Sequence, residues 1–254
     1  MWYQILAYFR FLTKSTNQHG VHSPFMYDLV TKCFYDASSK EIYKTLQQYR
    51  FDLLQDDTTI EVKDFGAGSR VFSSNKRKVS AIAKNAGITK KRAQLLTRLI
   101  SYLNIKTCLE LGTSLGIGTI AMKEADKVFT LEGCPETAQI AQKQFKKHNT
   151  KNIEIHVAPF EKSLTSFARN TYDLIYFDGN HQKEATLQYF EQLLETAHND
   201  SVFIFDDIHW SKEMTEAWEI IKNRPEVTVT IDTFFWGFVF FRKEQVKEHF
   251  IVRL

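Results

Sequence analysis

From residue 107 onward, short apolar runs alternate with segments of helical periodicity. Apolar runs of four or five residues bounded by turn residues indicate buried strands, whereas apolar residues repeating every three or four positions indicate helices. The predicted strands are Thr107–Leu111, Lys127–Leu131, Ile153–Val157, Leu174–Phe177, Val202–Phe205, Val227–Ile231 and Phe238–Phe241. The predicted helices between them are 119–125, 135–147, 160–168, 184–196 and 211–222. This alternation predicts βαβ units and a mainly parallel sheet.

The last two predicted strands are separated only by Asp232-Thr-Phe-Phe-Trp-Gly237. Because this connection is too short for a crossover helix, we expect the two strands to form a hairpin-like antiparallel pair at the sheet edge. The pattern therefore predicts an α/β fold with a seven-stranded, mostly parallel sheet, an antiparallel last strand and helices on both faces.

The first hundred residues have a different pattern, in which helical segments are interrupted by polar turns. Predicted helices cover 27–34, 41–53 and 91–103, and Trp2, Ile5, Leu6 and Phe9 form an apolar stripe at helical spacing. We expect this stripe to pack on the domain or on a second subunit, which leaves a homodimer open. The basic stretch 69–78 has little apolar periodicity and is predicted to be an exposed loop. We therefore divide the chain into a helical segment, 1–100, which covers the site or pairs subunits, and a ligand-binding domain, 101–254.

Composition narrows the possible classes of protein. The chain has 254 residues with 43% hydrophobic and 25% charged residues, which is ordinary for a globular protein. A net charge of +3 is too small to indicate nucleic-acid binding. The three cysteines are far apart, so we expect neither disulfides nor a zinc site, and we expect a cytoplasmic location. No apolar window is long enough for a membrane span, and we see no signal peptide.

A glycine-rich turn follows the first predicted strand of the sheet. The strand reaches Glu110, and the chain then turns over Gly112, Gly116 and Gly118 into a helix. Strand, glycine turn and helix in this order bring the backbone close to a nucleotide-like ligand. A second acid, Glu132, ends the next strand, where a carboxylate can accept both hydroxyls of a ribose. The G-x3-G-x-G spacing differs from the G-x-G-x-x-G of dinucleotide enzymes, so NAD is the weaker interpretation.

A second glycine turn, Val62-Lys-Asp-Phe-Gly-Ala-Gly-Ser69, resembles a cofactor turn in composition. A basic polar stretch follows it instead of a helix, and no acid-terminated strand lies at the right distance downstream. We interpret it as a glycine turn of the amino-terminal segment, with a role as a lid on the active site left open.

Acidic residues end two later strands. Asp178 follows one strand and is followed by a Gly179-Asn180 turn and His181, and the adjacent pair Asp206 and Asp207 follows the next. Adjacent strands bring these acids to the same sheet edge. Because like charges so close together repel, three converging carboxylates indicate a hard-cation site, most naturally for Mg²⁺. The alternative is that acids gather at strand ends only because these ends are wet.

The motif Glu110-Leu-Gly-Thr-x-x-Gly116 resembles the first motif of class I S-adenosylmethionine-dependent methyltransferases, in particular the catechol-O-methyltransferase-like group. This resemblance covers roughly residues 100–242 and implies a Rossmann-like fold. Asp206-Asp207-Ile208-His209-Trp210 is similar to the second acidic motif of the metal-dependent members, with Asp207 where the catechol type has asparagine; the macrolide-sugar O-methyltransferases similarly use two aspartates. His181 stands where the catechol type has a lysine base. The chain also resembles uncharacterised bacterial methyltransferases that carry His-Gly-Val-His-Ser-Pro-Phe, here residues 19–25.

The resemblance implies a role for each candidate residue. Asp178, Asp206 and Asp207 would be the metal ligands, and His181, with Asp178, would be catalytic. Pro159 and Phe160 are expected to flank the adenine. The residues expected to bind the cofactor are Glu110, Gly112, Thr113, Ser114, Gly116, Gly118, Glu132, Gly133, Pro159, Phe160 and Asp178.

The predicted function is therefore transfer of a methyl group from S-adenosylmethionine to an oxygen of a small molecule with vicinal oxygens, assisted by Mg²⁺. Two alternatives stay open. One is a metal-independent methyltransferase acting on RNA or protein, docked through the basic stretch 70–78. The other is a protein that binds the cofactor without catalysis.

Overall fold

The computed structural model describes residues 2–66, 68 and 72–254. The chain divides into two compact units. Unit 1 runs up to Tyr35 and resumes from Leu164 to Leu254, and unit 2 runs from Asp36 to Ser163. Residues 36–100 of the amino-terminal segment therefore lie in the same unit as the predicted cofactor turn. The roles that we predict for segments 1–100 and 101–254 stay predictions.

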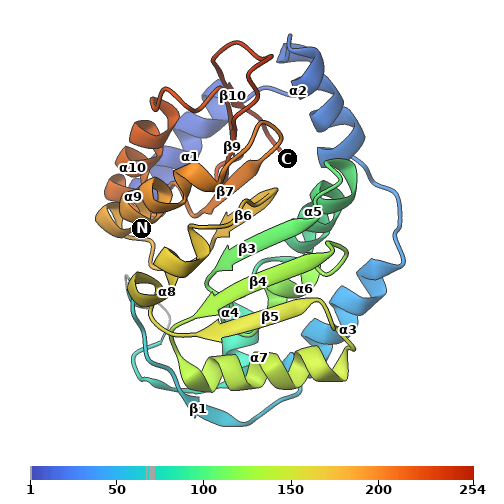
Figure 1. Ribbon diagram of the computed structural model, residues 1–254, viewed down its shortest axis with the longest axis vertical. Helices are drawn as coiled ribbons and strands as arrows, with labels where there is room; N and C mark the ends of the chain where they lie inside the picture. Colours follow the sequence, from blue (N-terminus) through green and yellow to red (C-terminus); the bar gives the residue numbers. More distant parts are fainter. Residues whose placement is uncertain (1, 67, 69–71) are drawn as a thin grey trace. The chain divides into compact units, whose positions relative to one another are not determined.

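Unit 2 contains three parallel strands in the order β3-β4-β5: β3(Thr107–Leu111), β4(Lys127–Glu132) and β5(Ile153–Val157). The long helix α7(Pro135–Lys147) packs along β4 and β5 (Figure 1). A separate antiparallel pair joins β1(Thr59–Glu61) to β2(Lys76–Lys78). The other helices of the unit are α3(Ile42–Leu54), α4(Val79–Asn85), α5(Lys90–Tyr102) and α6(Ile117–Ala121), and α8(Phe160–Phe167) begins at its end.

Unit 1 contains five strands in the order β10-β8-β9-β7-β6. They are β6(Leu174–Phe177), β7(Val202–Asp206), β8(Val229–Asp232), β9(Trp236–Phe240) and β10(Glu248–Ile251). The pairs β6–β7 and β8–β10 are parallel, whereas β9 is antiparallel to both β7 and β8. The helices are α1(Trp2–Lys14), α2(Pro24–Leu29), which continues as a π-helical turn over Val30–Phe34, α9(Lys183–Leu193) and α10(Lys212–Lys222), with single 3-10 turns at Gln18–Gly20 and Leu194–Thr196.

These elements confirm the predicted fold class. The seven predicted strands are all present, within about two residues of the predicted ends, and β8 and β9 form the expected antiparallel pair. Two details are wrong. Among the described residues, β10 is an eighth strand besides the seven that were predicted, so the predicted count of seven is too low. Because β10 pairs with the free side of β8, the antiparallel pair does not lie at the edge.

The amino-terminal segment departs further from the prediction. Lys76–Lys78 is strand β2, so this part of the basic stretch is not a loop, while residues 69–71 lie outside the described part. The apolar stripe of α1 is exposed, with Trp2 and Phe9 at 80% and 62%, so it does not pack on its own chain. A second subunit there stays a prediction. None of the described helices is long and apolar enough to cross a membrane.

A dense aromatic core holds the strand ends of unit 1. Phe177 and Phe205, the last apolar residues of β6 and β7, stack with ring centroids 4.3 Å apart. Phe190 on α9 packs edge-on against Phe205, and Trp218 on α10 is fully buried. Because such packing fixes the positions of the strands, the residues that immediately follow Phe177 and Phe205 are held at fixed places.

Candidate active site

The carboxylate of Glu110 is buried under the turn that follows β3. Its side chain has no exposed surface, and its Oε2 accepts hydrogen bonds from the hydroxyls of Thr119 and Thr130 at 2.5 and 2.6 Å. Its Oε1 has no hydrogen-bond partner among the described residues. Burial raises the pKa of the Glu110 carboxyl to about 8, against the opposing effect of the two threonine hydroxyls.

The glycine turn is shaped by packing as well as by backbone conformation. Gly116 has φ +79°, and a Cβ there would meet the Tyr49 hydroxyl and the Phe145 ring. Tyr49, on α3, is fully buried and donates a hydrogen bond to the carbonyl of Leu115 at 2.8 Å. Helix α3 of the amino-terminal segment thus packs against the glycine turn. The sequence pattern did not indicate this contact.

Glu132 links the two strand ends of the predicted ribose site. Its Oε2 accepts from the backbone N–H of Ser114 at 2.7 Å, and its Oε1 accepts from that of Cys134 at 2.8 Å. Burial raises the pKa of Glu132, while these backbone hydrogen bonds lower it. A carboxylate oxygen can accept more than one hydrogen bond, so the oriented Glu132 carboxylate is suited to accept hydroxyl groups of a ligand as well.

Burial divides the predicted cofactor-binding residues of unit 2 into two groups. Partly exposed positions, which a ligand can touch directly, are Gly112, Ser114, Glu132, Gly133, Pro159 and Phe160. The positions below them that shape the turn from inside are Glu110, Thr113, Gly116 and Gly118. The Oγ1 atoms of Thr113 and Thr130 lie 2.5 Å apart, which ties the turn to β4. The exposed group forms one continuous edge along the ends of β3, β4 and β5.

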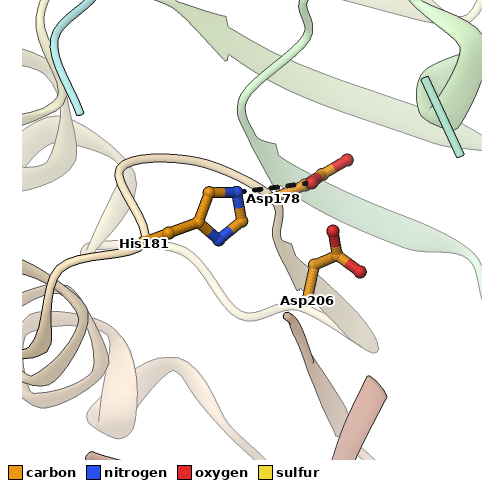
Figure 2. A group of neighbouring side chains, drawn as sticks. All are labelled: Asp178, His181 and Asp206. Carbon is orange, nitrogen blue, oxygen red and sulfur yellow. Dashed lines mark ion pairs between the residues drawn. The ribbon is translucent and has the colours of Figure 1, made fainter. Parts of the chain in front are cut away.

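In unit 1, the parallel register of β6 and β7 places two acids side by side. Phe177 pairs with Phe205 in the ladder, so Asp178 and Asp206 follow at equivalent places. One ligand atom from each of Asp178, His181 and Asp206 lies within 4.8 Å of the others. His181 Nε2 is 4.0 Å from Asp178 Oδ1. Figure 2 shows the imidazole and the two carboxylates pointing toward one another.

The loop that presents His181 has an uncommon backbone conformation. Asn180 and His181 have φ values of +71° and +46°, and the His181 N–H bonds the carbonyl of Gly179 at 3.0 Å. Asn180 Nδ2 donates to the Tyr189 hydroxyl on α9 at 3.1 Å, which anchors this turn. Left-handed conformations at consecutive non-glycine residues are costly, and they persist where the surrounding structure enforces them, often at functional sites.

Asp207 lies outside the group of three, although the sequence analysis placed it among the metal ligands. Its backbone is also left-handed, with φ +54°, and its carbonyl accepts the N–H of Trp210 at 2.8 Å. In the same loop, His209 is held on both ring nitrogens, by Asp232 at 2.8 Å and Thr215 at 3.0 Å. The structure thus adds His181 to Asp178 and Asp206, and the ligand role of Asp207 stays a prediction.

The three side chains suit a divalent cation. In an octahedral site with bonds of about 2.1 Å, neighbouring ligand atoms lie about 3 Å apart and opposite ones about 4.2 Å apart, so the three side chains would move closer together to share one cation. Two carboxylates suit Mg²⁺, whereas an imidazole nitrogen is typical of transition metals. Side-chain exposure of 20% at Asp178 and 26% at His181 leaves room for a ligand to reach them.

Comparisons with known proteins concern the class of domain and the fold. Residues 109–208 match a family described as a methyltransferase domain. A putative O-methyltransferase from Klebsiella pneumoniae has the same fold, with 17% identity, a TM-score of 0.56, and 82% of this chain and 92% of that chain covered. An O-methyltransferase from Bacillus cereus in complex with SAH is 17% identical, with a TM-score of 0.56 and with 81% of this chain and 93% of that chain covered. A third structure is TomG from Streptomyces achromogenes, an O-methyltransferase involved in tomaymycin synthesis, in complex with SAM. It is 15% identical, with a TM-score of 0.57 and with 84% of this chain and 95% of that chain covered.

No curated protein matches the chain by sequence. The matched domain and the fold confirm the enzyme class expected from the sequence, an S-adenosylmethionine-dependent methyltransferase with the class I fold. The substrate and the use of a metal are matters of proposal.

Proposed function

We propose that the chain transfers a methyl group from S-adenosylmethionine to an oxygen of a small molecule with two neighbouring oxygens, at a site that holds a divalent cation. The observation that carries this proposal is the group formed by Asp178, His181 and Asp206 at the ends of two paired strands. In a methyltransferase domain, a cation held by these side chains can bind and orient vicinal oxygens of the acceptor.

The cofactor is expected at the exposed edge of unit 2. Glu132 would accept the ribose hydroxyls, and Gly112 and Ser114 would border the methionine part. Pro159 and Phe160, at the start of α8, would lie beside the adenine. Solved structures with the same fold contain SAH or SAM, which supports this choice of cofactor.

The residues of unit 1 would prepare the acceptor. A bound divalent cation lowers the pKa of a coordinated hydroxyl and fixes its direction toward the methyl group. Asp178 and Asp206 would hold the cation through carboxylate oxygens. His181 has two ring nitrogens, so it can be a third ligand or can accept the proton of the acceptor hydroxyl.

Methylation of a metabolite extract with labelled cofactor tests the function, with and without a chelator. We expect labelled products that disappear on chelation and return when Mg²⁺ or Mn²⁺ is added. Asp206→Asn should lower the rate at least tenfold, since the loss of a residue that only supports a metal ligand already costs about 10- to 100-fold. The matched variant Asp200→Asn, on an exposed aspartate paired with Arg242, should retain the wild-type rate.

Two results would contradict parts of this proposal. Activity that persists in chelator would contradict the role of a metal and would favour a metal-independent methyltransferase. An equal rate in Asp206→Asn and wild type would remove Asp206 from the site. Thermal melts of both variants show whether a lower rate reflects unfolding.

A further inference from the structure

The backbone of Gly133 is covered by an aromatic ring from another part of unit 2. A Cβ on Gly133 would lie 2.7 Å from Phe65 Cδ2 and 2.9 Å from its Cε2, so the ring rests directly on this glycine. Phe65 belongs to the glycine turn that the sequence analysis set apart from the cofactor site. Gly133 is the residue after Glu132, so Phe65 lies next to the predicted ribose carboxylate.

The segment that carries Phe65 is bonded to the start of α7. The Lys63 N–H donates to the Cys134 thiol at 3.3 Å, and this thiol donates to the carbonyl of Glu61 at 3.7 Å. The Glu61 N–H donates to the Glu136 carboxylate at 2.5 Å. These three contacts join the backbone of residues 61–63 to the side chains of Cys134 and Glu136, so the position of the ring does not depend on its contact with Gly133 alone.

Much of the Phe65 side chain is exposed to solvent. It is 42% exposed, with the ammonium of Lys63 5.1 Å from the ring centroid. An exposed ring fixed beside the partly exposed carboxylate of Glu132 offers an apolar surface to a ligand that this carboxylate holds. In a nucleoside the base is joined to the ribose one carbon from the 2′-hydroxyl, so a base lies within about one ring width of the group that binds the hydroxyls.

We propose that Phe65 forms an aromatic wall of the adenine subsite, in the place that the missing side chain of Gly133 leaves open. The inference rests on the proposed cofactor site at Glu132 and assigns it a new binding residue, from the amino-terminal segment. The adenine ring packs against the Phe65 ring, which provides contact area without a further hydrogen bond.

Calorimetry with two probes tests this wall: S-adenosylhomocysteine and 5′-methylthioadenosine, which keeps the adenosine and lacks the amino acid. Phe65→Ala should weaken the binding of both by about tenfold, within the five- to 150-fold range typical of base–aromatic stacking. Phe65→Tyr should bind both like wild type. The matched control Phe51→Ala removes an exposed ring of α3, 55% exposed, and should leave both affinities unchanged.

The outcomes separate this inference from the proposed function. If wild type binds neither probe, the cofactor site itself is wrong. If wild type binds both and Phe65→Ala binds them within twofold as well, only the aromatic wall is overturned. A loss confined to S-adenosylhomocysteine would also overturn it, because Phe65 would then act on the amino-acid part.

Discussion

Two turns of unit 2 have the same composition, a carboxylate followed by closely spaced glycines, and they differ in almost every physical respect. The Glu110–Gly118 turn joins a buried strand to a helix, whereas Asp64, Gly66 and Gly68 lie between the short strands β1 and β2. Glu110 is fully buried and bonded to two threonines. The Asp64 side chain is 33% exposed, and it accepts the Gly66 N–H at 3.0 Å and lies 3.8 Å from Arg77.

The two glycines with positive φ repeat this contrast. Gly116 and Gly68 have φ values of +79° and +76°, but a Cβ at Gly116 would meet Tyr49 and Phe145, whereas at Gly68 no described atom lies within 4 Å. Glycine spacing alone therefore does not define a cofactor turn. Packing beneath the turn and the acid on the next strand distinguish one from the other.

The largest expected difference between the turns concerns their acids. The pKa of Glu110 is raised to about 8, so the folded protein keeps a proton that the unfolded chain loses above pH 4.5. The free energy of unfolding should therefore fall as pH rises from about 4.5 to about 8, by up to about 5 kcal/mol. Urea denaturation across this range should show the decrease in wild type, and Glu110→Gln should remove this part of the pH dependence.

Asp64→Asn is the matched control for this experiment, because water reaches the Asp64 carboxylate. This variant should keep the decrease in unfolding free energy that Glu110 causes. If Glu110→Gln also keeps it, the buried carboxyl does not hold a proton in the folded state, and the contrast between the two acids disappears.

Alanine at the two glycines should have the next largest effect. Gly116→Ala combines left-handed strain of about 1–2 kcal/mol with overpacking against Tyr49 and Phe145, so we expect a loss of about 3 kcal/mol in unfolding free energy. Gly68→Ala carries only the strain and should cost about 1 kcal/mol. Chemical denaturation measures both. Equal losses at the two positions would mean that the neighbours of Gly116 move away at little cost.

Much of the fold was predictable because its strands are strongly apolar. Leu174–Phe177 and Thr107–Leu111 were placed to the residue. The sequence analysis missed β10, which has one buried residue, Phe250, and missed β1 and β2, which are short and polar. These strands exist through pairing with a partner, and such pairing leaves no hydrophobic period in the sequence.

The candidate site was predictable where it follows from strand order. Asp178 and Asp206 lie together because β6 and β7 are parallel neighbours, as the pattern indicated. Tyr49 behind Gly116 and Phe65 on Gly133 could not be found in this way, since each reaches its glycine across more than sixty residues. Contacts of this kind depend on how the amino-terminal segment packs, and neither periodicity nor a motif in the sequence predicts that packing.

The most direct test of the account is calorimetric titration of S-adenosylhomocysteine into wild type and Glu132→Ala, with NAD as the comparison ligand. Wild type should bind S-adenosylhomocysteine and bind NAD poorly. Glu132→Ala should bind it more weakly by about 1–3 kcal/mol, since the ribose loses charge-assisted hydrogen bonds. Glu124→Ala, on an exposed glutamate of the same unit, should bind like wild type. Unchanged affinity in Glu132→Ala, or no binding by wild type, would contradict the assignment of the cofactor to the edge formed by Gly112, Ser114 and Glu132.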